Sequence, residues 1–109
     1  MYKLAFFVPE SHLESVKDAV FASGAGRFKN YEACCFQTHG QGQFRPLQGA
    51  RPHIGAVDTL EIVEEYRVEL VCEDLRIRAA ITALIEAHPY EEPAYDVWPL
   101  SDLDSLPPG

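Results

Sequence analysis

The sequence predicts an α+β fold, in which an antiparallel sheet carries two helices on one face and the elements follow the order βαββαβ. Three observations support this fold class. The chain has 109 residues, enough for about one domain. Hydrophobic residues make up 47% of it and charged residues 24%, a mixture that can bury a core. Segments with the two-residue period of strands also alternate with segments that have the three- to four-residue period of helices.

The first strand and the first helix are expected near the N-terminus. Residues 2–8 are rich in aromatic and branched side chains and stop at Pro9, as a buried strand does. Ser11 stands three residues before Glu14, which is the spacing of a capping box and predicts the start of a helix. The helix should end at residues 24–26, where Gly-Ala-Gly permits a left-handed cap. Its apolar positions follow three- and four-residue steps: Leu13, Val16 and Val20.

The second and third strands are expected on either side of a long loop. Residues 31–39 contain one charged side chain, Glu32, and predict a strand. Residues 40–55 contain four glycines and two prolines, and they predict a loop with a short hairpin around Phe44. Loops of this length often bind a ligand or a partner. Residues 60–72 predict the third strand, because apolar side chains alternate toward its end: Tyr66, Val68, Leu70 and Cys72.

The second helix and the last strand complete the pattern. Asp74 is expected to cap the helix, and Pro89 prevents the helix from continuing past His88. Residues 95–100 supply a short final strand. The apolar stripe of the second helix consists of Ile77, Ile81, Leu84 and Ile85.

Elements in this order fold most simply as the split βαβ, or ferredoxin-like, arrangement. We therefore expect one ferredoxin-like domain at residues 1–100 and a polar C-terminal tail at residues 101–109. Two helices cover one face of such a sheet and leave the other face open. Because both sides of the strands carry apolar groups, we expect the open face to contact another subunit in a homo-oligomer, as a trimer or a dimer.

The net charge and the cysteine content limit the partners and the compartment that we expect. Nine basic and seventeen acidic side chains give a net charge of −8 at pH 7, the wrong sign for binding nucleic acid or an anionic membrane surface. Three cysteines without CxxC spacing form neither a disulfide framework nor a zinc site, so we expect a reducing, cytoplasmic environment. No segment approaches the roughly 20 apolar residues that span a bilayer.

The densest group of polar side chains lies in residues 88–95, His-Pro-Tyr-Glu-Glu-Pro-Ala-Tyr. It places an imidazole, two phenols and two carboxylates around a helix-to-strand turn. The helix C-terminus and the carboxylates beside it favour the charged form of His88. The same pattern also fits a purely structural turn, in which the prolines fix the backbone and Tyr90 packs.

The loop at residues 40–55 offers a second candidate surface. Its Gly-Gln-Gly lacks the ending of a phosphate-binding P-loop. Three basic side chains could instead bind a carboxylate or a phosphate, although the loop could equally reach over a neighbouring subunit. A metal site built from Cys34 or Cys35 with His39 or His88 stays open as an alternative. The basic side chains of the loop are Arg45, Arg51 and His53.

A set of motifs along nearly the whole chain resembles the short domain inserted in the NIF3-like (DUF34, YqfO) family, which also occurs as a stand-alone protein. One position departs from the pattern, since Lys29 stands where glycine is expected before Asn-Tyr. The larger domain of full-length members holds a dinuclear metal centre and is absent from these residues, so no metal-hydrolase activity is implied. The motifs are Gly24-Ala25-Gly26, Asn30-Tyr31 with Cys34, Phe36 with Gly40-x-Gly42-x-Phe44-x-Pro46, Gly49-Ala50-x-Pro52-x-Ile54-Gly55, and His88-Pro89-Tyr90-Glu91-Glu92-Pro93-Ala94-Tyr95.

The closing His-Pro-Tyr-Glu, which begins at His88, is also similar to a segment of CutA-type divalent-ion tolerance proteins. Those proteins share the ferredoxin-like, PII-like architecture and assemble as trimers. The resemblance implies a PII/CutA-like fold and favours a trimer in which sheets meet edge to edge.

Together these features predict a non-enzymatic, self-associating module that binds a small ligand, a divalent ion or a protein as a regulatory element. A CutA-like protein that responds to divalent metal is the alternative, and a small enzyme with an intersubunit site around His88 and Glu91 is a third hypothesis. We expect no catalytic residue, no metal ligand and no cofactor. Whether the loop at 40–55 meets the turn at 88–95 decides whether they form one site. The candidate ligand-binding residues are Tyr31, Cys34, Arg51, His53, His88, Tyr90, Glu91 and Glu92.

Overall fold

The computed structural model describes residues 1–109 and contains the predicted order of elements, βαββαβ. Short 3-10 turns precede both helices, and a third lies in the C-terminal tail at Leu103–Ser105. Neither helix is long and apolar enough to cross a membrane. The main elements are β1 (Tyr2–Pro9), α1 (Leu13–Ala22), β2 (Phe36–Phe44), β3 (Glu61–Cys72), α2 (Ile77–Ala87) and β4 (Tyr95–Pro99).

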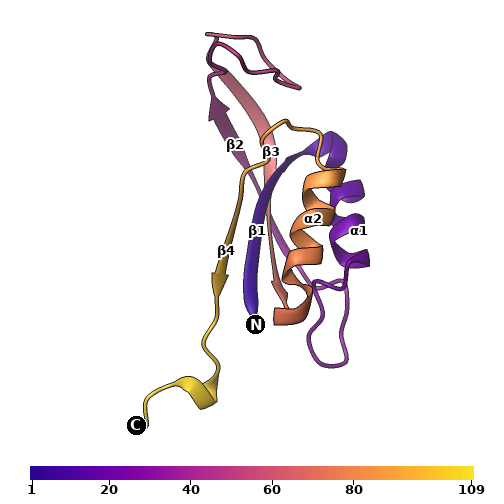
Figure 1. Ribbon diagram of the computed structural model, residues 1–109, viewed down its shortest axis with the longest axis vertical. Coiled ribbons are helices and arrows are strands. Elements are labelled where there is room, and N and C mark those ends of the chain that lie inside the picture. The colour runs from indigo at the N-terminus through magenta and orange to yellow at the C-terminus, as the bar shows by residue number, and fades with distance from the viewer.

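The four strands form one antiparallel sheet in the order β2-β3-β1-β4, and both helices cover the same face (Figure 1). The α+β, ferredoxin-like prediction is therefore confirmed. In β1, Leu4, Phe6 and Val8 face the helices, and their partners on β3 lie on the same side of the sheet. The core consists of Leu4, Phe6, Val8, Leu13, Val16, Val20, Ala25, Val68, Leu70, Cys72, Ala80 and Leu84.

The helix starts differ from the predictions. Ser11 makes no cap, because its hydroxyl lies 2.8 Å from Nδ1 of His12 within the first 3-10 turn. Asp74 makes no side-chain cap either, since its carboxylate pairs with the N-terminal ammonium group. Both helices instead follow an extended residue and a 3-10 turn, so local backbone geometry replaces the expected capping side chains.

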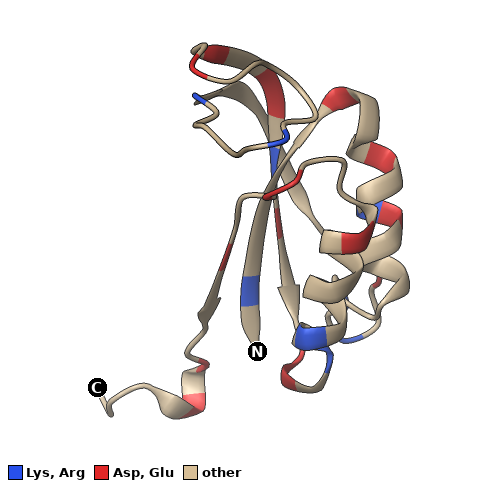
Figure 2. Cartoon of the chain, turned by 45° about the horizontal axis from the view of Figure 1, so that its top comes forward, with Lys and Arg blue, Asp and Glu red and all other residues tan.

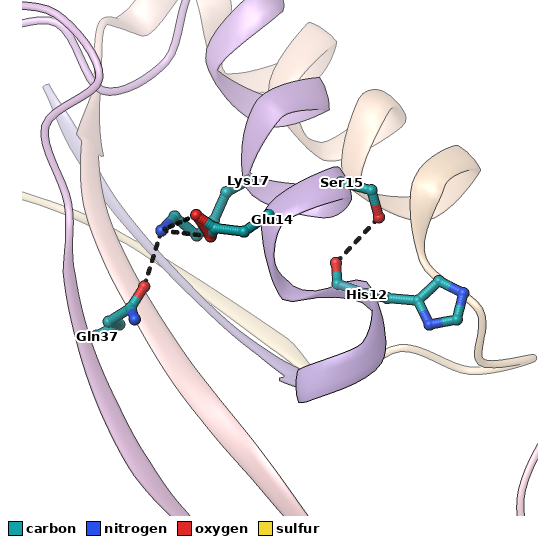
Figure 3. A network of polar contacts seen from close by, with 5 residues as sticks. All are labelled: His12, Glu14, Ser15, Lys17 and Gln37. Carbon is teal, nitrogen blue, oxygen red and sulfur yellow. Dashed lines mark hydrogen bonds and ion pairs between the residues drawn. The ribbon is translucent and has the colours of Figure 1, made fainter.

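Polar side chains of α1 fix its start and tie it to the sheet (Figure 3). The Ser15 hydroxyl donates to the carbonyl of His12 at 3.2 Å. The Lys17 ammonium group donates to the Glu14 carboxylate and to the side-chain oxygen of Gln37, both at 2.9 Å. Because Gln37 belongs to β2, this contact fastens the edge strand to the helix layer.

The second strand begins later than predicted, at Phe36, and ends at Phe44. Residues 31–35, which were predicted as strand, belong to the loop before β2, because Lys29 and Ala33 have φ of 53° and 57°, in the left-handed region that interrupts extended backbone. The strand therefore includes Gly40 and Gly42, and the long loop shifts from the predicted residues 40–55 to residues 45–60.

The face of the sheet opposite the helices is uncovered, as predicted, but it is not uniformly apolar. The guanidinium group of Arg67 lies 5.9 Å from the ring centre of Phe7 and 3.1 Å from the carboxylate of Glu69. Exposed aromatic side chains flank these charges, with Phe36 at one edge and Trp98 at the other. This face therefore mixes aromatic and charged groups.

The molecule is elongated, with principal extents of 52 × 31 × 24 Å. Its radius of gyration is 15.8 Å, against about 13 Å for a compact domain of this length. The hairpin of β2 and β3 projects beyond the helices at one end, and the C-terminal tail points away at the other (Figure 1). Acidic residues are spread over helices, strands and tail (Figure 2).

Candidate functional site

A cavity of about 460 Å³ lies at the end of the sheet where β1 and β2 finish and β3 begins. Its walls come from Phe7 of β1, the end of β2, the loop at 45–54, Glu65 of β3 and the turn at 90–94. The long loop and the His-Pro-Tyr-Glu-Glu turn therefore meet. A cavity of this size matches the volumes of small-molecule sites.

His88 fixes the turn that forms one wall. The helix ends because His88 has extended backbone, with ψ of 138°, before Pro89. The Tyr90 N–H donates to Nδ1 of His88 at 3.1 Å, so the ring proton is on Nε2, which donates to the Phe7 carbonyl at 2.7 Å. Burial is the main cause that lowers the pKa of His88. The expectation of a charged His88 is wrong, and neither ring nitrogen is free to act on a ligand.

Tyr90 supplies the most unusual polar group of the cavity. Its ring packs against the rings of His88, His53 and Phe44, with centroid separations of 4.8, 6.2 and 6.4 Å. Its hydroxyl is buried and has no hydrogen-bond partner. Burial raises the pKa of Tyr90, and the negative charge of Glu65 raises it further. The surroundings of Tyr90 therefore favour the neutral phenol.

Glu65 faces the same cavity as Tyr90. A Cβ at Gly42 would overlap the Glu65 carboxylate, so glycine provides the space in which this side chain lies. The neighbouring Glu64 pairs with His39 at 2.9 Å and accepts from Gln41 at 3.1 Å, whereas no such partner engages Glu65. Burial raises the pKa of the Glu65 carboxyl group.

Arg51 joins the loop to the turn through its backbone, since its N–H donates to the Glu91 carboxylate at 3.1 Å. Its guanidinium group does not line the cavity. The lining side chains include two of the three basic groups and also three carboxylates, so the cavity wall carries charges of both signs. The basic groups are Arg45 and His53, and the carboxylates are Glu65, Glu91 and Glu92.

Two of the candidate residues lie elsewhere. Tyr31 and Cys34 belong to the loop that joins α1 to β2, at the opposite end of the sheet (Figure 1). The Tyr31 side chain is exposed, and the Cys34 thiol lies 3.7 Å from the carbonyl of Glu32. The structure thus brings together Arg51, His53, His88, Tyr90, Glu91 and Glu92.

No group of three or more His, Cys, Asp or Glu side chains is arranged to hold a metal ion. The proposed pairing of cysteines with His88 is not formed, because the His88 ring nitrogens contact Phe7 and Tyr90. All three cysteines are free.

Several lining residues were missed because they lie on strands. Glu65 lies one residue before the alternating series that begins at Tyr66, and this pattern does not indicate that Gly42 leaves room beside it. Phe44 carried a signal, since it belongs to the Gly-x-Gly-x-Phe-x-Pro motif that precedes the loop. No sequence feature other than strand alternation pointed to Phe7. The apolar lining is completed by Pro46, Leu47, Ala50, Pro52, Ile54 and Ala94.

No family model matches the chain. Curated proteins named GTP cyclohydrolase 1 type 2 homolog are similar to nearly all of it. The protein of Halalkalibacterium halodurans is 42% identical over 102 residues, which cover 94% of this chain and 27% of that protein. The protein of Bacillus subtilis is 46% identical over 98 residues, covering 90% of this chain and 26% of that protein. The chain thus spans about a quarter of the length of these relatives.

Solved structures show the same similarity to NIF3-related proteins, and they add a similarity to CutA proteins. A Bacillus cereus protein related to NIF3 superposes with a TM-score of 0.80 at 42% identity, covering 93% of this chain and 26% of that one. CutA from Xylella fastidiosa superposes with a TM-score of 0.67 at 21% identity, covering 93% and 84%. The PII-like protein CutA from Nostoc superposes with a TM-score of 0.68 at 18% identity, covering 97% and 86%. The CutA likeness concerns the fold alone, and the predicted NIF3-like and PII/CutA-like resemblances are confirmed.

Proposed function

We propose that this chain, which is a NIF3-like domain, is a non-enzymatic module that binds a small organic ligand and associates with copies of itself. The observation that carries the proposal is the meeting of the 45–60 loop and the 88–95 turn around a cavity of about 460 Å³. A mostly apolar cavity of this size with a few polar groups on its wall is the usual form of a small-molecule site.

A binding role fits the cavity better than a catalytic one. His88 is the side chain best suited to proton transfer near neutral pH, yet both of its ring nitrogens are engaged by the backbone. Glu65 lines the cavity without a hydrogen-bond partner in the protein, so it is able to contact a ligand. Regulation would follow if a ligand changed the position of the loop and thus the surface presented to a partner.

Self-association is supported by shape and exposure. A chain with a radius of gyration of 15.8 Å buries only 17 of its 109 residues by itself. The uncovered sheet face carries exposed Phe36 and Trp98, which would be shielded in a dimer or trimer.

The free thiols of Cys34 and Cys35 fit a reducing compartment such as the cytoplasm.

Protein-observed NMR with a set of one- and two-ring fragments tests the binding role. Bound fragments should shift amide resonances of Ile54, Tyr90 and Glu91, and they should leave the distant Tyr31 unchanged. Shifts that gather at Tyr31, or the absence of shifts with every fragment, would contradict the proposal.

Light scattering at micromolar protein concentration tests the self-association separately. A mass of two or three chains is expected. A stable monomer would rule out this part of the proposal and leave the binding role intact.

A further inference from the structure

Aromatic side chains from three parts of the chain line the cavity: Phe7 from β1, Phe44 from the end of β2 and Tyr90 from the turn. The ring centres of Phe44 and Tyr90 are 6.4 Å apart. The faces of aromatic rings attract cations, and sites lined by several rings are a known way to bind organic ammonium groups. One ring of the cavity already has a cation beside it, since the guanidinium group of Arg67 lies 5.9 Å from the ring centre of Phe7.

The same wall carries an excess of negative charge. Three carboxylates line it against one guanidinium group, that of Arg45, so two negative charges are in excess when His53 is neutral. None of the three carboxylates forms an ion pair with a basic group of the protein. A cationic ligand would therefore be attracted to this cavity, and an anionic one would be repelled. The carboxylates are Glu65, Glu91 and Glu92.

Glu65 is the carboxylate best placed to contact a ligand. Its side chain is partly buried, and it lines both this cavity and an adjoining hollow of about 380 Å³ on the uncovered sheet face. Arg67 lines the same hollow but forms its ion pair with Glu69, at 3.1 Å. A partly buried carboxylate without a partner is unfavourable, and burial raises the pKa of this one. A cation bound beside Glu65 would offset that cost.

We propose that the cavity binds a small organic cation, whose charged nitrogen group pairs with the Glu65 carboxylate and whose apolar body packs against the rings of Phe44 and Tyr90. A volume of about 460 Å³ accommodates a ligand of one or two rings. This inference rests on the proposed binding function and names the ligand class of that same site. Glu65 then determines the specificity for charge.

Benzamidine, benzamide and benzoate test the charge of the ligand, because the three molecules have nearly the same shape and are cationic, neutral and anionic at neutral pH. Titrations followed by protein-observed NMR should give the tightest binding for benzamidine. The amide resonances of Ile54 and Tyr90 should shift, because both residues line the cavity.

Substitution of Glu65 tests its role directly. Glu65→Gln should raise the Kd of benzamidine by about tenfold or more, because it removes a charge-assisted hydrogen bond, and it should change the Kd of benzamide little. Glu64→Gln is the matched control, since it removes the same charge from the neighbouring residue. It should leave the Kd of benzamidine nearly unchanged, because Glu64 pairs with His39 and does not line the cavity.

The pH dependence of binding gives a second measurement. Benzamidine keeps its charge in mildly acidic solution, whereas Glu65 loses its charge as the pH falls through its raised pKa. The affinity of the wild type for benzamidine should therefore fall between about pH 7 and about pH 5, and that of Glu65→Gln should fall less. An equal fall in the two proteins would overturn the pairing with Glu65.

The other outcomes separate this inference from the proposed function. If benzamide or benzoate shifts the cavity resonances as strongly as benzamidine does, the ligand class is wrong and the binding site stands. If Glu65→Gln and Glu64→Gln weaken benzamidine equally, the cation is attracted only by the acidic chain as a whole, and the inference is wrong. If none of the three probes and none of the fragments shifts these resonances, the binding function fails as well.

Discussion

The two ends of the sheet are built in different ways. At the end covered by α1 and α2, twelve buried side chains form one continuous core. At the other end, β2 contains no buried residue, and a few hydrogen bonds hold the long loop, among them Asp58 N–H to the Pro46 carbonyl at 2.7 Å. The covered end therefore supplies most of the folding free energy, and the cavity lies at the end where the chain can move with the least loss of buried contact.

The largest effect that distinguishes the two ends is expected from a core substitution. Leu84→Ala should lower the free energy of unfolding by about 3–5 kcal/mol, because it opens a cavity at a fully buried position. Urea denaturation monitored by circular dichroism measures this loss. The same change at Leu75, whose exposure is 95%, is the matched control and should cost at most about 0.5 kcal/mol. Equal losses at the two leucines would contradict the position of the core.

His88 links the two ends, so its removal should have an intermediate effect. His88→Ala leaves the Phe7 carbonyl and the Tyr90 N–H without their partners and should cost about 2–3 kcal/mol. Hydrogen exchange of the Tyr90 amide should also become faster. His39→Ala is the control, because His39 is exposed and contacts an exposed carboxylate, and it should cost at most about 1 kcal/mol. Unchanged exchange at Tyr90 would argue against the linking role.

The buried His88 should also make stability depend on pH. Its pKa is lowered in the folded protein, chiefly by burial and further by His12 and His53, while the Phe7 carbonyl opposes the shift. The unfolded chain therefore binds a proton first as the pH falls below about 6.5, and stability is lost from there down to the folded pKa.

Urea denaturation at pH 7.5 and at pH 5.5 measures this change. His88→Gln should show a smaller loss of stability between these values than the wild type does. The raised pKa of Glu65 acts in the opposite direction at lower pH, so measurements with Glu65→Gln separate the two groups. If His88→Gln keeps the full pH dependence of stability, that dependence comes from other groups.

The smallest effect on stability is expected at the cavity end. Gly42→Ala displaces the Glu65 carboxylate, which is the mobile end of a side chain. The free energy of unfolding should therefore change by at most about 1 kcal/mol. Binding of any fragment that shifts the cavity resonances should nevertheless weaken severalfold, because Glu65 lines the cavity. Gly40→Ala is the control, since a Cβ there meets no atom within 4 Å, and it should leave binding unchanged. Equal effects of the two substitutions on binding would mean that the position of Glu65 does not matter for binding.

Local sequence patterns predicted the elements that depend on periodicity or on a single strong residue. The boundary of α2 at Pro89 and the position of β1 near the N-terminus are examples. The start of β2 was wrong, because a left-handed backbone at Lys29 and Ala33 depends on contacts such as Cys34 N–H to the Gly26 carbonyl at 2.8 Å. Such contacts leave no periodic trace in the sequence.

The candidate site was also predicted only in part, because some of its properties depend on tertiary contacts. The turn and the loop were found by their unusual composition, and Tyr90 and His53 lie in the cavity as their motifs suggested. The pairing of Gly40 with Glu65 across two strands, and the burial that keeps His88 neutral, are tertiary properties. Sequence spacing alone could therefore indicate where a site forms but not the charge or the partners of its groups.

The length of β3 has an evolutionary consequence. Its twelve residues, at about 3.3 Å each, extend over about 40 Å. The half from Val68 to Cys72 packs under the helices, and the half from Glu61 to Glu65 pairs mainly with the projecting part of β2. Mutations in the projecting half therefore encounter little constraint from the core. Relatives could diversify what they bind by changing this hairpin and its loop while inheriting the helix-covered layer unchanged.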